Sequence, residues 1–255
     1  ARQLADALTG QEFEVTDVTE KPSKRSPAAP FTTSTLQQEA SRKLRWGAQR
    51  MSRVAQGLYE RGYITYIRTD STVLSATAVA AARSQAADMF GSDHVAATER
   101  RYANKAKNAQ EAHEAIRPAG DVFRTPADVA GELVGDDFAL YDLIWKRTLA
   151  SQMADAKVAT TTVRIGATAG DGRRTEFSAS GTVVVFAGFL AAYEEGTDDE
   201  DGGRPEGRLP IMRTGDPLEV RSLEASGHET KPPARYTEAS LTKQLEERGI
   251  GRPST

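Results

Sequence analysis

A tyrosine and an arginine two positions apart, Tyr66 and Arg68, are the residues of this sequence best suited by type and spacing to do chemistry. They lie in the stretch that runs from Gly62 to Ser71 and reads GYITYIRTDS. Its β-branched and aromatic residues favour a strand over residues 63–67, bounded by the glycine and by a polar cluster. Since alternate residues of a strand share a face, Tyr66 and Arg68 are predicted to point the same way.

A phenol beside a guanidinium suits the attack of a tyrosine oxygen on a phosphodiester. A phenol has a pKa of about 10, and a fixed cation nearby lowers the cost of ionising it. The guanidinium can also hold phosphate oxygens and stabilise the charge that builds up in the transition state. An aromatic residue on a strand more often fills a core, however, so the pair alone leaves both interpretations of Tyr66 open. Tyr63, on the opposite face of the predicted strand, is assigned to packing.

A second candidate is His113, within the segment Gln110–Pro118. This segment nearly matches the zinc motif H-E-x-x-H, but Arg117 stands where the second histidine belongs. The sequence holds three histidines and no cysteine, so no metal site is expected in this chain. On its own, His113 fits a hydrogen-bonded structural histidine better than a catalytic one.

Charge is distributed unevenly along the chain, although its total is nearly balanced. The 255 residues are 27% charged with a net charge of −3, which does not by itself indicate a nucleic-acid-binding protein. Residues 41–53 and 100–107 carry basic residues and no acid, and such local patches can contact phosphates. The acidic, glycine-rich residues 194–210 are expected to form a mobile loop, whose Asp198–Asp201 cluster is solvated and binds no metal.

Several function classes are disfavoured by what the sequence lacks. The absence of cysteine removes disulfides and thiolate metal sites and agrees with a reducing cytoplasm. No signal peptide and no apolar run long enough to cross a membrane is present. No G-x-x-x-x-G-K-[ST] phosphate loop occurs, so the sequence does not support an ATP-driven activity.

Helical and β-type periods occupy different parts of the chain, which predicts an α+β fold. Helices are predicted over residues 2–10, about 34–58 with a break at 46–47, 75–90, from 126, about 136–153 and 237–247. Their expected caps are Ser34 or Thr35, Ser75, Thr125 and Thr237. Strands are predicted over residues 13–18, 158–165, 175–180, 182–186 and 218–223, and residues 21–30 are predicted to be an extended linker. The two helices before Tyr63 fit either a helix-turn-helix or two packed core helices.

The stretch from Gly62 to Ser71 resembles the active-site motif of type IA DNA topoisomerases, of the form G-x-I-T-Y-x-R-T-D-S. Two further segments resemble the same family in the same order. They are Gln110–Pro118 (QEAHEAIRP) and Pro232–Leu241 (PPARYTEASL), and the second continues into Gly249–Thr255 (GIGRPST). The resemblance begins near Phe31 and reaches the last residue, and three long matches in order are far more specific than one short pattern.

This resemblance implies that Tyr66 forms a covalent bond to the 5′ phosphate of a cut single strand, so that religation needs no ATP. Arg68 is expected to stabilise the phosphate in the transition state, and His113 is expected to lie beside the tyrosine. Glu111 and Arg117 are expected either to support these groups or simply to form a salt bridge with each other. The residues expected at DNA are Arg68, Thr69, Asp70, Ser71, Arg117, Arg235, Thr237 and Arg252.

The resemblance also implies a discontinuous architecture. Residues 1–30 and 157–227 are expected to form a β-rich gate or hinge domain. A mainly helical domain that carries the active-site tyrosine, residues 31–156, is expected to be inserted into it. Residues 228–255 are expected to begin a second, truncated helical DNA-binding domain, and the whole enzyme is expected to close into a ring around DNA.

The amino-terminal toprim domain of the family, which holds Mg²⁺ with a glutamate and a D-x-D cluster, has no match in this sequence. The chain begins without Met and stops inside a motif, so it is expected to be a piece that does not relax DNA alone. The expected partners are single-stranded or negatively supercoiled DNA and the toprim domain of the same polypeptide. A monomer in the cytoplasm, associated with the nucleoid, is expected.

Two other functions remain open at this point. A non-catalytic, helix-turn-helix-like DNA-binding module would use the basic helices around residues 41–53 and form no covalent adduct. The second function is that of an enzyme of another kind, a tyrosine recombinase or a phosphodiesterase. A recombinase joins its tyrosine to a 3′ phosphate. The polarity of a trapped adduct therefore separates these functions.

Overall fold

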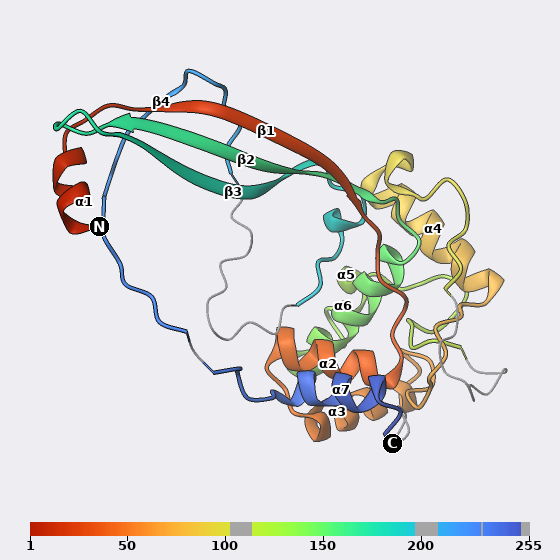
Figure 1. Cartoon of the computed structure of the whole chain (residues 1–255). Helices are drawn as coiled ribbons and strands as arrows, with labels where there is room; N and C mark the ends of the chain where they lie inside the picture. The colour runs from red at the N-terminus through yellow and green to blue at the C-terminus, as the bar shows by residue number, and fades with distance from the viewer. Residues whose placement is uncertain (103–113, 197–208, 231, 251–255) are drawn as a thin grey trace. The chain divides into compact units, whose positions relative to one another are not determined.

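The computed structural model describes residues 1–102, 114–196, 209–230 and 232–250. They contain an antiparallel sheet and a set of helices, which confirms the α+β prediction (Figure 1). The chain divides into two compact units. Unit 1 comprises residues 1–25, 157–186 and 200–234, and unit 2 comprises residues 26–156, 187–199 and 235–255.

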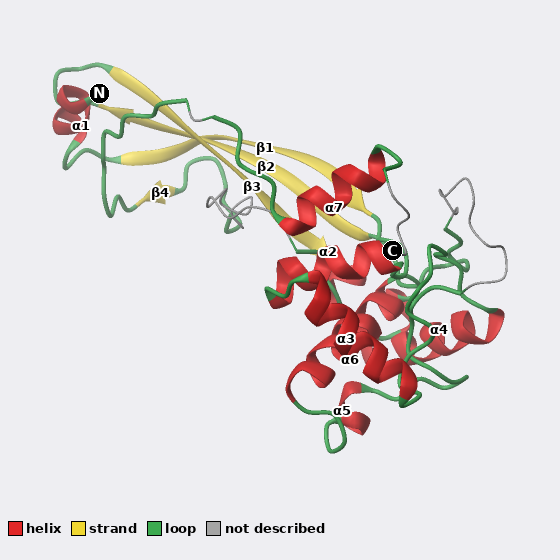
Figure 2. Cartoon of the chain, turned by 90° about the horizontal axis from the view of Figure 1, so that it is seen from below, coloured by secondary structure: helices red, strands yellow, loops and turns green. Residues whose placement is uncertain are grey.

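Unit 1 is built on a sheet of four strands in the order β3-β2-β1-β4 (Figure 2). Strands β1 (Phe13–Arg25), β2 (Ala156–Thr168) and β3 (Arg174–Phe186) are long, whereas β4 (Pro217–Leu218) has two residues. Helix α1 (Arg2–Leu8) contacts the turn between β2 and β3, where the N–H of Gly170 donates to the carbonyl of Ala7. The core at this end consists of Leu8, Phe13, Ala167 and Ala169, with Leu4, Ala7, Ile165, Phe177, Leu218 and Leu223 packed against it.

The strands differ from their predicted lengths in three places. β1 continues through Pro22 to Arg25, where a linker was predicted. Proline is tolerated there because β4 pairs with β1 only at Phe13 and Glu14, so one side of the strand needs no further N–H donors. β3 runs through Gly181 as one strand where two were predicted, and the strand predicted over residues 218–223 reduces to the two residues of β4.

Unit 2 is helical and is organised around α6 (Gly135–Ala150). The other helices are α2 (Thr33–Leu44), α3 (Ala48–Glu60), α4 (Ala76–Phe90), α5 (Pro126–Val129) and α7 (Glu238–Glu247), with single 3-10 turns η1 (Ser92–His94) and η2 (Gly188–Ala191). α6 contacts α2, α3, α4 and α5. Helical spacing predicts that Phe138, Tyr141, Ile144, Trp145, Thr148 and Leu149 form its apolar face, and all of them are buried except Phe138, which is half-buried.

Three helix starts follow the predicted capping chemistry. Ser75, Thr125 and Thr237 each accept a hydrogen bond from the N–H group three residues on. The predicted cap of α2 is wrong, because this helix is capped by Thr32, two or three residues before the predicted Ser34 or Thr35. The hydroxyl of Thr35 in turn accepts the backbone N–H of Thr32, so the two threonines form a reciprocal capping box.

Two glycines of unit 2 provide a matched test of this packing. Gly188 has a φ of +50°, and a Cβ atom there would lie 2.5 Å from the carbonyl oxygen of Asp155. Gly188→Ala should therefore destabilise the protein by roughly 2–3 kcal/mol through strain and overpacking. Gly57 lies inside α3 with nothing within 4 Å of its Cβ position, so Gly57→Ala should stabilise by about 0.5–1 kcal/mol. Denaturant titration measures both changes, and a neutral Gly188→Ala or a destabilising Gly57→Ala would contradict the packing described.

Candidate active site

Residues 65–73, named here the tyrosine loop, carry Tyr66 and Arg68 in irregular backbone. The predicted strand over residues 63–67 is wrong, because only Ile64 forms a β-bridge, to Pro118. A short apolar run does not specify its partner, and here no neighbouring strand supplies one along residues 65–73. The backbone groups of the loop are bonded in another way.

Thr65 anchors the first end of the tyrosine loop. Its N–H donates to the carbonyl of Arg117 at 2.9 Å, and its hydroxyl donates to the carbonyl of Ala115 at 2.8 Å. The N–H of Arg117 donates back to the Thr65 hydroxyl at 3.0 Å. At the other end of the loop, the N–H of Ala115 donates to the carbonyl of Val73 at 2.8 Å. Residues 114–118 therefore tie the two ends of the loop together.

The start of α2 anchors the middle of the loop. The N–H of Thr33 donates to the carbonyl of Thr69 at 2.9 Å, and its hydroxyl donates to the carbonyl of Ile67 at 2.6 Å. The loop is thus held at three places by strong backbone hydrogen-bonding groups that would otherwise be unpaired. Tyr66 keeps 43% of its surface exposed, and Arg68 is exposed as well.

The Tyr66 ring has a defined neighbour at the end of α3. The rings of Tyr59 and Tyr66 meet edge to face, with 5.3 Å between their centroids and an interplanar angle of 64°. The chain reverses between them at Gly62, which has a φ of +75°. The N–H of Tyr63 donates to the carbonyl of Leu58 at 2.9 Å, which closes a glycine-dependent helix ending. The edge-to-face contact with Tyr59 helps to fix the orientation of the Tyr66 ring at the surface.

Tyr63 has the environment of a structural tyrosine. Its hydroxyl donates to Glu132 at 2.6 Å, and its ring meets that of Tyr141 edge to face. The hydrogen bond to Glu132, followed by desolvation, raises the pKa of Tyr63, so this phenol is harder to ionise than an ordinary one. The Arg124 guanidinium also binds Glu132 and, with Tyr63, lowers its pKa to about 2. This network supports the assignment of Tyr63 to packing.

The Arg117 guanidinium is buried and holds residues 114–120 in place. Its Nε and Nη2 donate to one oxygen of Glu114, at 3.1 and 2.7 Å, and its Nη1 donates to the carbonyls of Pro118 and Gly120. The other Glu114 oxygen accepts the N–H of Ser75, the cap of α4, at 2.6 Å. Desolvation alone would raise the pKa of Glu114, but the hydrogen bonds from Ser75 and Arg117 outweigh it and the pKa lies below its usual range. Arg117 thus pairs with Glu114, a partner that the sequence did not indicate, and its expected partner Glu111 lies outside the described residues.

The other residues expected at the site or at DNA divide into three groups. Thr69 and Ser71 are each 1% exposed, and their hydroxyls accept backbone N–H groups within the loop, so in this conformation they shape the loop. Asp70 is half-buried, Arg235 is exposed and Thr237 caps α7. The expected residues Glu111, His113 and Arg252 lie outside the described residues.

Sequence reasoning missed three residues that shape the site, namely Thr33, Tyr59 and Glu114. Tyr59 could have been found from Gly62, because a glycine just after a helix signals a chain reversal that returns residues 63–66 toward the last helical turn. Thr33 binds Thr69 and Glu114 binds Ser75, each far away in the sequence, and no local pattern indicates these two contacts.

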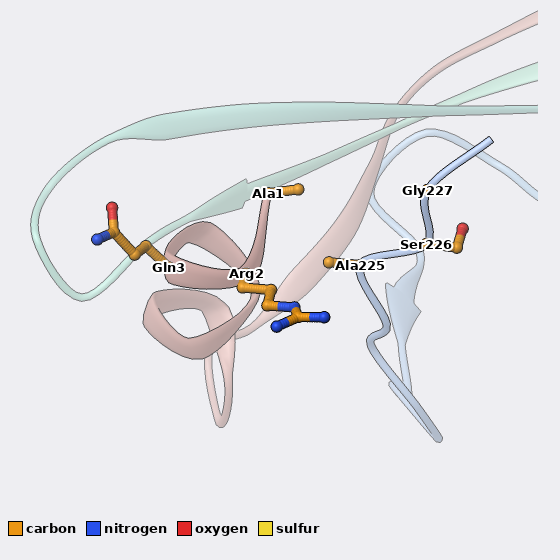
Figure 3. Close-up of a pocket in the computed structure, with 6 residues that line it drawn as sticks. All are labelled: Ala1, Arg2, Gln3, Ala225, Ser226 and Gly227. Atoms are coloured by element: carbon orange, nitrogen blue, oxygen red, sulfur yellow. The ribbon is translucent and has the colours of Figure 1, made fainter. Parts of the chain in front are cut away.

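A cavity of about 500 Å³ in unit 1 lies apart in sequence from these residues (Figure 3). It is lined by Ala1, Arg2, Gln3, Ala225, Ser226 and Gly227. Figure 3 shows one charged side chain there, that of Arg2, and none of the predicted site residues. No helix of the described part of the chain has the length and apolar character needed to cross a membrane.

An exposed tyrosine and an exposed arginine on one braced loop define a candidate site for phosphoryl transfer. Comparison with known proteins agrees with this class. The DNA topoisomerase family matches residues 1–255, and the chain belongs to that family, the bacterial type IA DNA topoisomerases.

Relatives and a solved structure cover the whole chain. It is 60% identical to DNA topoisomerase 1 of Streptomyces coelicolor over 257 residues and 55% identical to DNA topoisomerase 1 of Mycolicibacterium smegmatis over 258 residues. All of this chain is covered in both comparisons, but only 27% and 28% of the relatives' length. The structure of full-length topoisomerase I from Thermotoga maritima is similar with a TM-score of 0.73 at 36% identity, covering 100% of this chain and 41% of that one.

The pairing of Glu114 with Arg117 predicts a pH-dependent stability. Glu114→Gln should destabilise the protein at pH 7 by roughly 2 kcal/mol, because it leaves the buried Arg117 without its charged partner. Folding lowers the pKa of Glu114, so its ionised carboxylate stabilises the wild-type protein. This contribution is fully present above the unfolded pKa of about 4.3 and is lost as the pH falls through the folded pKa. The difference in free energy of unfolding between the two proteins should therefore close in acid.

Denaturant titrations from neutral pH down to about pH 3 measure this difference. Glu132→Gln is the matched control, since it breaks an Arg124 pair that is about half exposed and should change stability much less. A gap between wild type and Glu114→Gln that stays constant into acid would show that the carboxylate charge of Glu114 is not what holds Arg117.

Proposed function

We propose that this chain is the tyrosine-bearing part of a type IA DNA topoisomerase, which relaxes negatively supercoiled DNA by cutting and rejoining one strand through Tyr66. The observation that carries the proposal is an exposed phenol on a loop braced by Thr65, Thr33 and residues 114–118, in a member of that family. Because the chain spans about a quarter of its relatives' length, this activity is proposed for the whole protein.

The proposed reaction exchanges one phosphate ester for another. The Tyr66 oxygen loses its proton and bonds to phosphorus, and the bond from phosphorus to the 3′ oxygen breaks. The 3′ oxygen leaves with a proton, and the 5′ phosphate stays on the tyrosine. Since the ester energy is kept, the reverse attack reseals the strand after another strand has passed, and no ATP is consumed. Arg68, exposed on the same loop, binds the phosphate oxygens and stabilises their added charge.

The proposal extends to residues near the loop. His113 directly precedes the segment that ties the ends of the tyrosine loop, and it is proposed to assist at the scissile phosphate. Arg235 is exposed just before α7, whose first turn is capped by Thr237, and these residues are proposed to contact single-stranded DNA with Arg252. Tyr236, 63% exposed between them, adds a ring on which a base can stack.

The donors in the part of the chain that the structure describes do not fit a Mg²⁺ site. Among the described residues no group of three or more His, Asp or Glu side chains could hold a metal ion. We therefore propose that the ligands of Mg²⁺ belong to the toprim domain of the same polypeptide, as the family resemblance implies, and no step is assigned to the metal here. Unit 1 is proposed to be the gate or hinge of a monomeric enzyme that works on nucleoid DNA in the cytoplasm. Unit 2 is proposed to hold the tyrosine domain and, in residues 235–255, part of a second helical DNA-binding domain that begins at residue 228.

The alternative of a non-catalytic, helix-turn-helix-like module has less support. The helices α2 and α3 do form, but much of their positive charge is bound within the protein. Arg50 donates two hydrogen bonds of 2.8 Å to Asp136, Arg42 lies 3.7 Å from Glu39, and the Lys43 ammonium lies over the Tyr193 ring. A tyrosine recombinase is distinguished by its 3′ linkage.

Replacing Tyr66 tests the proposed function. In a full-length protein that carries this chain, Tyr66→Phe should abolish plasmid relaxation, because it removes the attacking oxygen and leaves the ring in place. Tyr63→Phe is the matched control and should retain relaxation within about tenfold, since this hydroxyl serves Glu132. Agarose-gel assays of supercoiled plasmid measure both. Relaxation by Tyr66→Phe would remove Tyr66 as the nucleophile.

The chain by itself is predicted to leave supercoiled plasmid unchanged in the presence of Mg²⁺, because the proposed metal ligands lie in the toprim domain. Adding the toprim domain in trans, or restoring it in cis, should produce tyrosine-linked DNA. Metal-dependent relaxation by the pure chain would overturn this part of the proposal.

A further inference from the structure

We propose that Thr33 is a positioning residue that sets the orientation of Arg68 for phosphoryl transfer. This inference rests on the proposed function of the tyrosine loop and adds a residue to it. Thr33 is the first residue of α2 and lies more than thirty positions before the loop that it contacts.

The Thr33 hydroxyl binds the peptide groups on both sides of Arg68. It donates to the carbonyl of Ile67 at 2.6 Å, with the carbonyl of Thr69 also within reach at 3.1 Å. It accepts the N–H of Thr69 at 3.0 Å. A single oxygen atom therefore bonds to the residue before Arg68 and to the residue after it.

These hydrogen bonds are important because the residues that they join to Thr33 are buried. Ile67 and Thr69 are 7% and 1% exposed, whereas Arg68 between them is exposed. Buried backbone groups without a partner cost free energy, so removal of the hydroxyl would force the peptides around Arg68 to rotate toward other partners. Arg68 would turn with them, because its side chain leaves the same backbone. Small displacements of a catalytic group reduce rates strongly.

The overall fold depends less on this hydroxyl. The N–H of Thr33 still donates to the carbonyl of Thr69 when the side chain is changed. The start of α2 is capped by the neighbouring Thr32, whose hydroxyl accepts the N–H of Thr35 at 3.2 Å. Thr32 and Thr33 are adjacent residues of the same type, one bonded within its own helix and one bonded to the tyrosine loop. They form a matched pair for experiment.

The test uses a full-length protein that carries this chain and a single-stranded oligonucleotide with Mg²⁺. Thr33→Val should slow single-turnover formation of the covalent adduct by about 10- to 100-fold, while oligonucleotide affinity changes less than about twofold. Thr33→Ser, which restores the hydroxyl, should recover most of the rate. Thr32→Val should lower the melting temperature and leave the rate of adduct formation nearly unchanged.

A double-mutant cycle with Arg68→Ala shows whether Thr33 acts through the arginine. If it does, Thr33→Val should cause little further loss in the Arg68→Ala background. Adduct formation at the wild-type rate in Thr33→Val, or effects of Thr33→Val and Arg68→Ala that simply multiply, would overturn the inference. Should Thr33→Val fail to fold, the smaller Thr33→Ala is judged by the same outcomes. If Tyr66→Phe formed the adduct, the proposed function itself would fail. If Tyr66→Phe formed no adduct while Thr33→Val formed it at the wild-type rate, only the role of Thr33 would be rejected.

Discussion

The candidate site depends on how an irregular loop satisfies its backbone hydrogen bonds. The tyrosine loop belongs to neither a helix nor a strand, yet parts of it are buried and need partners for their N–H and C=O groups. Thr33, Ala115 and Arg117 supply these partners from two other segments, the start of α2 and residues 114–118. The loop can therefore expose Tyr66 and Arg68 while its backbone stays fixed, which is the preorganisation that transfer of a phosphoryl group requires.

The helices of unit 2 hold the loop and the segments that bind it in place. α2 begins at Thr33 behind a threonine capping box, and its buried Leu36 and Ala40 lie in the core. α3 places Tyr59 beside Tyr66 through the turn at Gly62. Residues 114–118 are held through Glu114, which joins the cap of α4 to the buried Arg117 guanidinium. Ordinary helix capping and packing thus determine where the loop lies, and the loop determines what its side chains can do.

Local chemistry made part of this structure predictable from sequence. The caps Ser75, Thr125 and Thr237 and the apolar face of α6 follow from residue types and helical spacing, and the structure confirms them. Residues 63–67 were predicted to be a strand because their types favour one, but strands need partners, and residues 65–73 are bonded to side chains and loops. The same limit applies to the surroundings of Arg117, since the sequence does not show that Glu114 and two carbonyls bind its guanidinium. Family membership was recognisable from three motifs, whereas the roles of Tyr66, Arg68 and His113 remain proposals.

The central claim is that the Tyr66 oxygen forms the bond to DNA, and mapping the bond tests it most directly. The covalent complex of the full-length protein with a single-stranded oligonucleotide would be trapped by denaturation, digested with protease and nuclease, and sequenced by mass spectrometry. The account predicts one modified peptide, with a nucleotide joined through its 5′ phosphate to Tyr66. A nucleotide on Tyr59 or Tyr63, or a linkage through a 3′ phosphate, would contradict it.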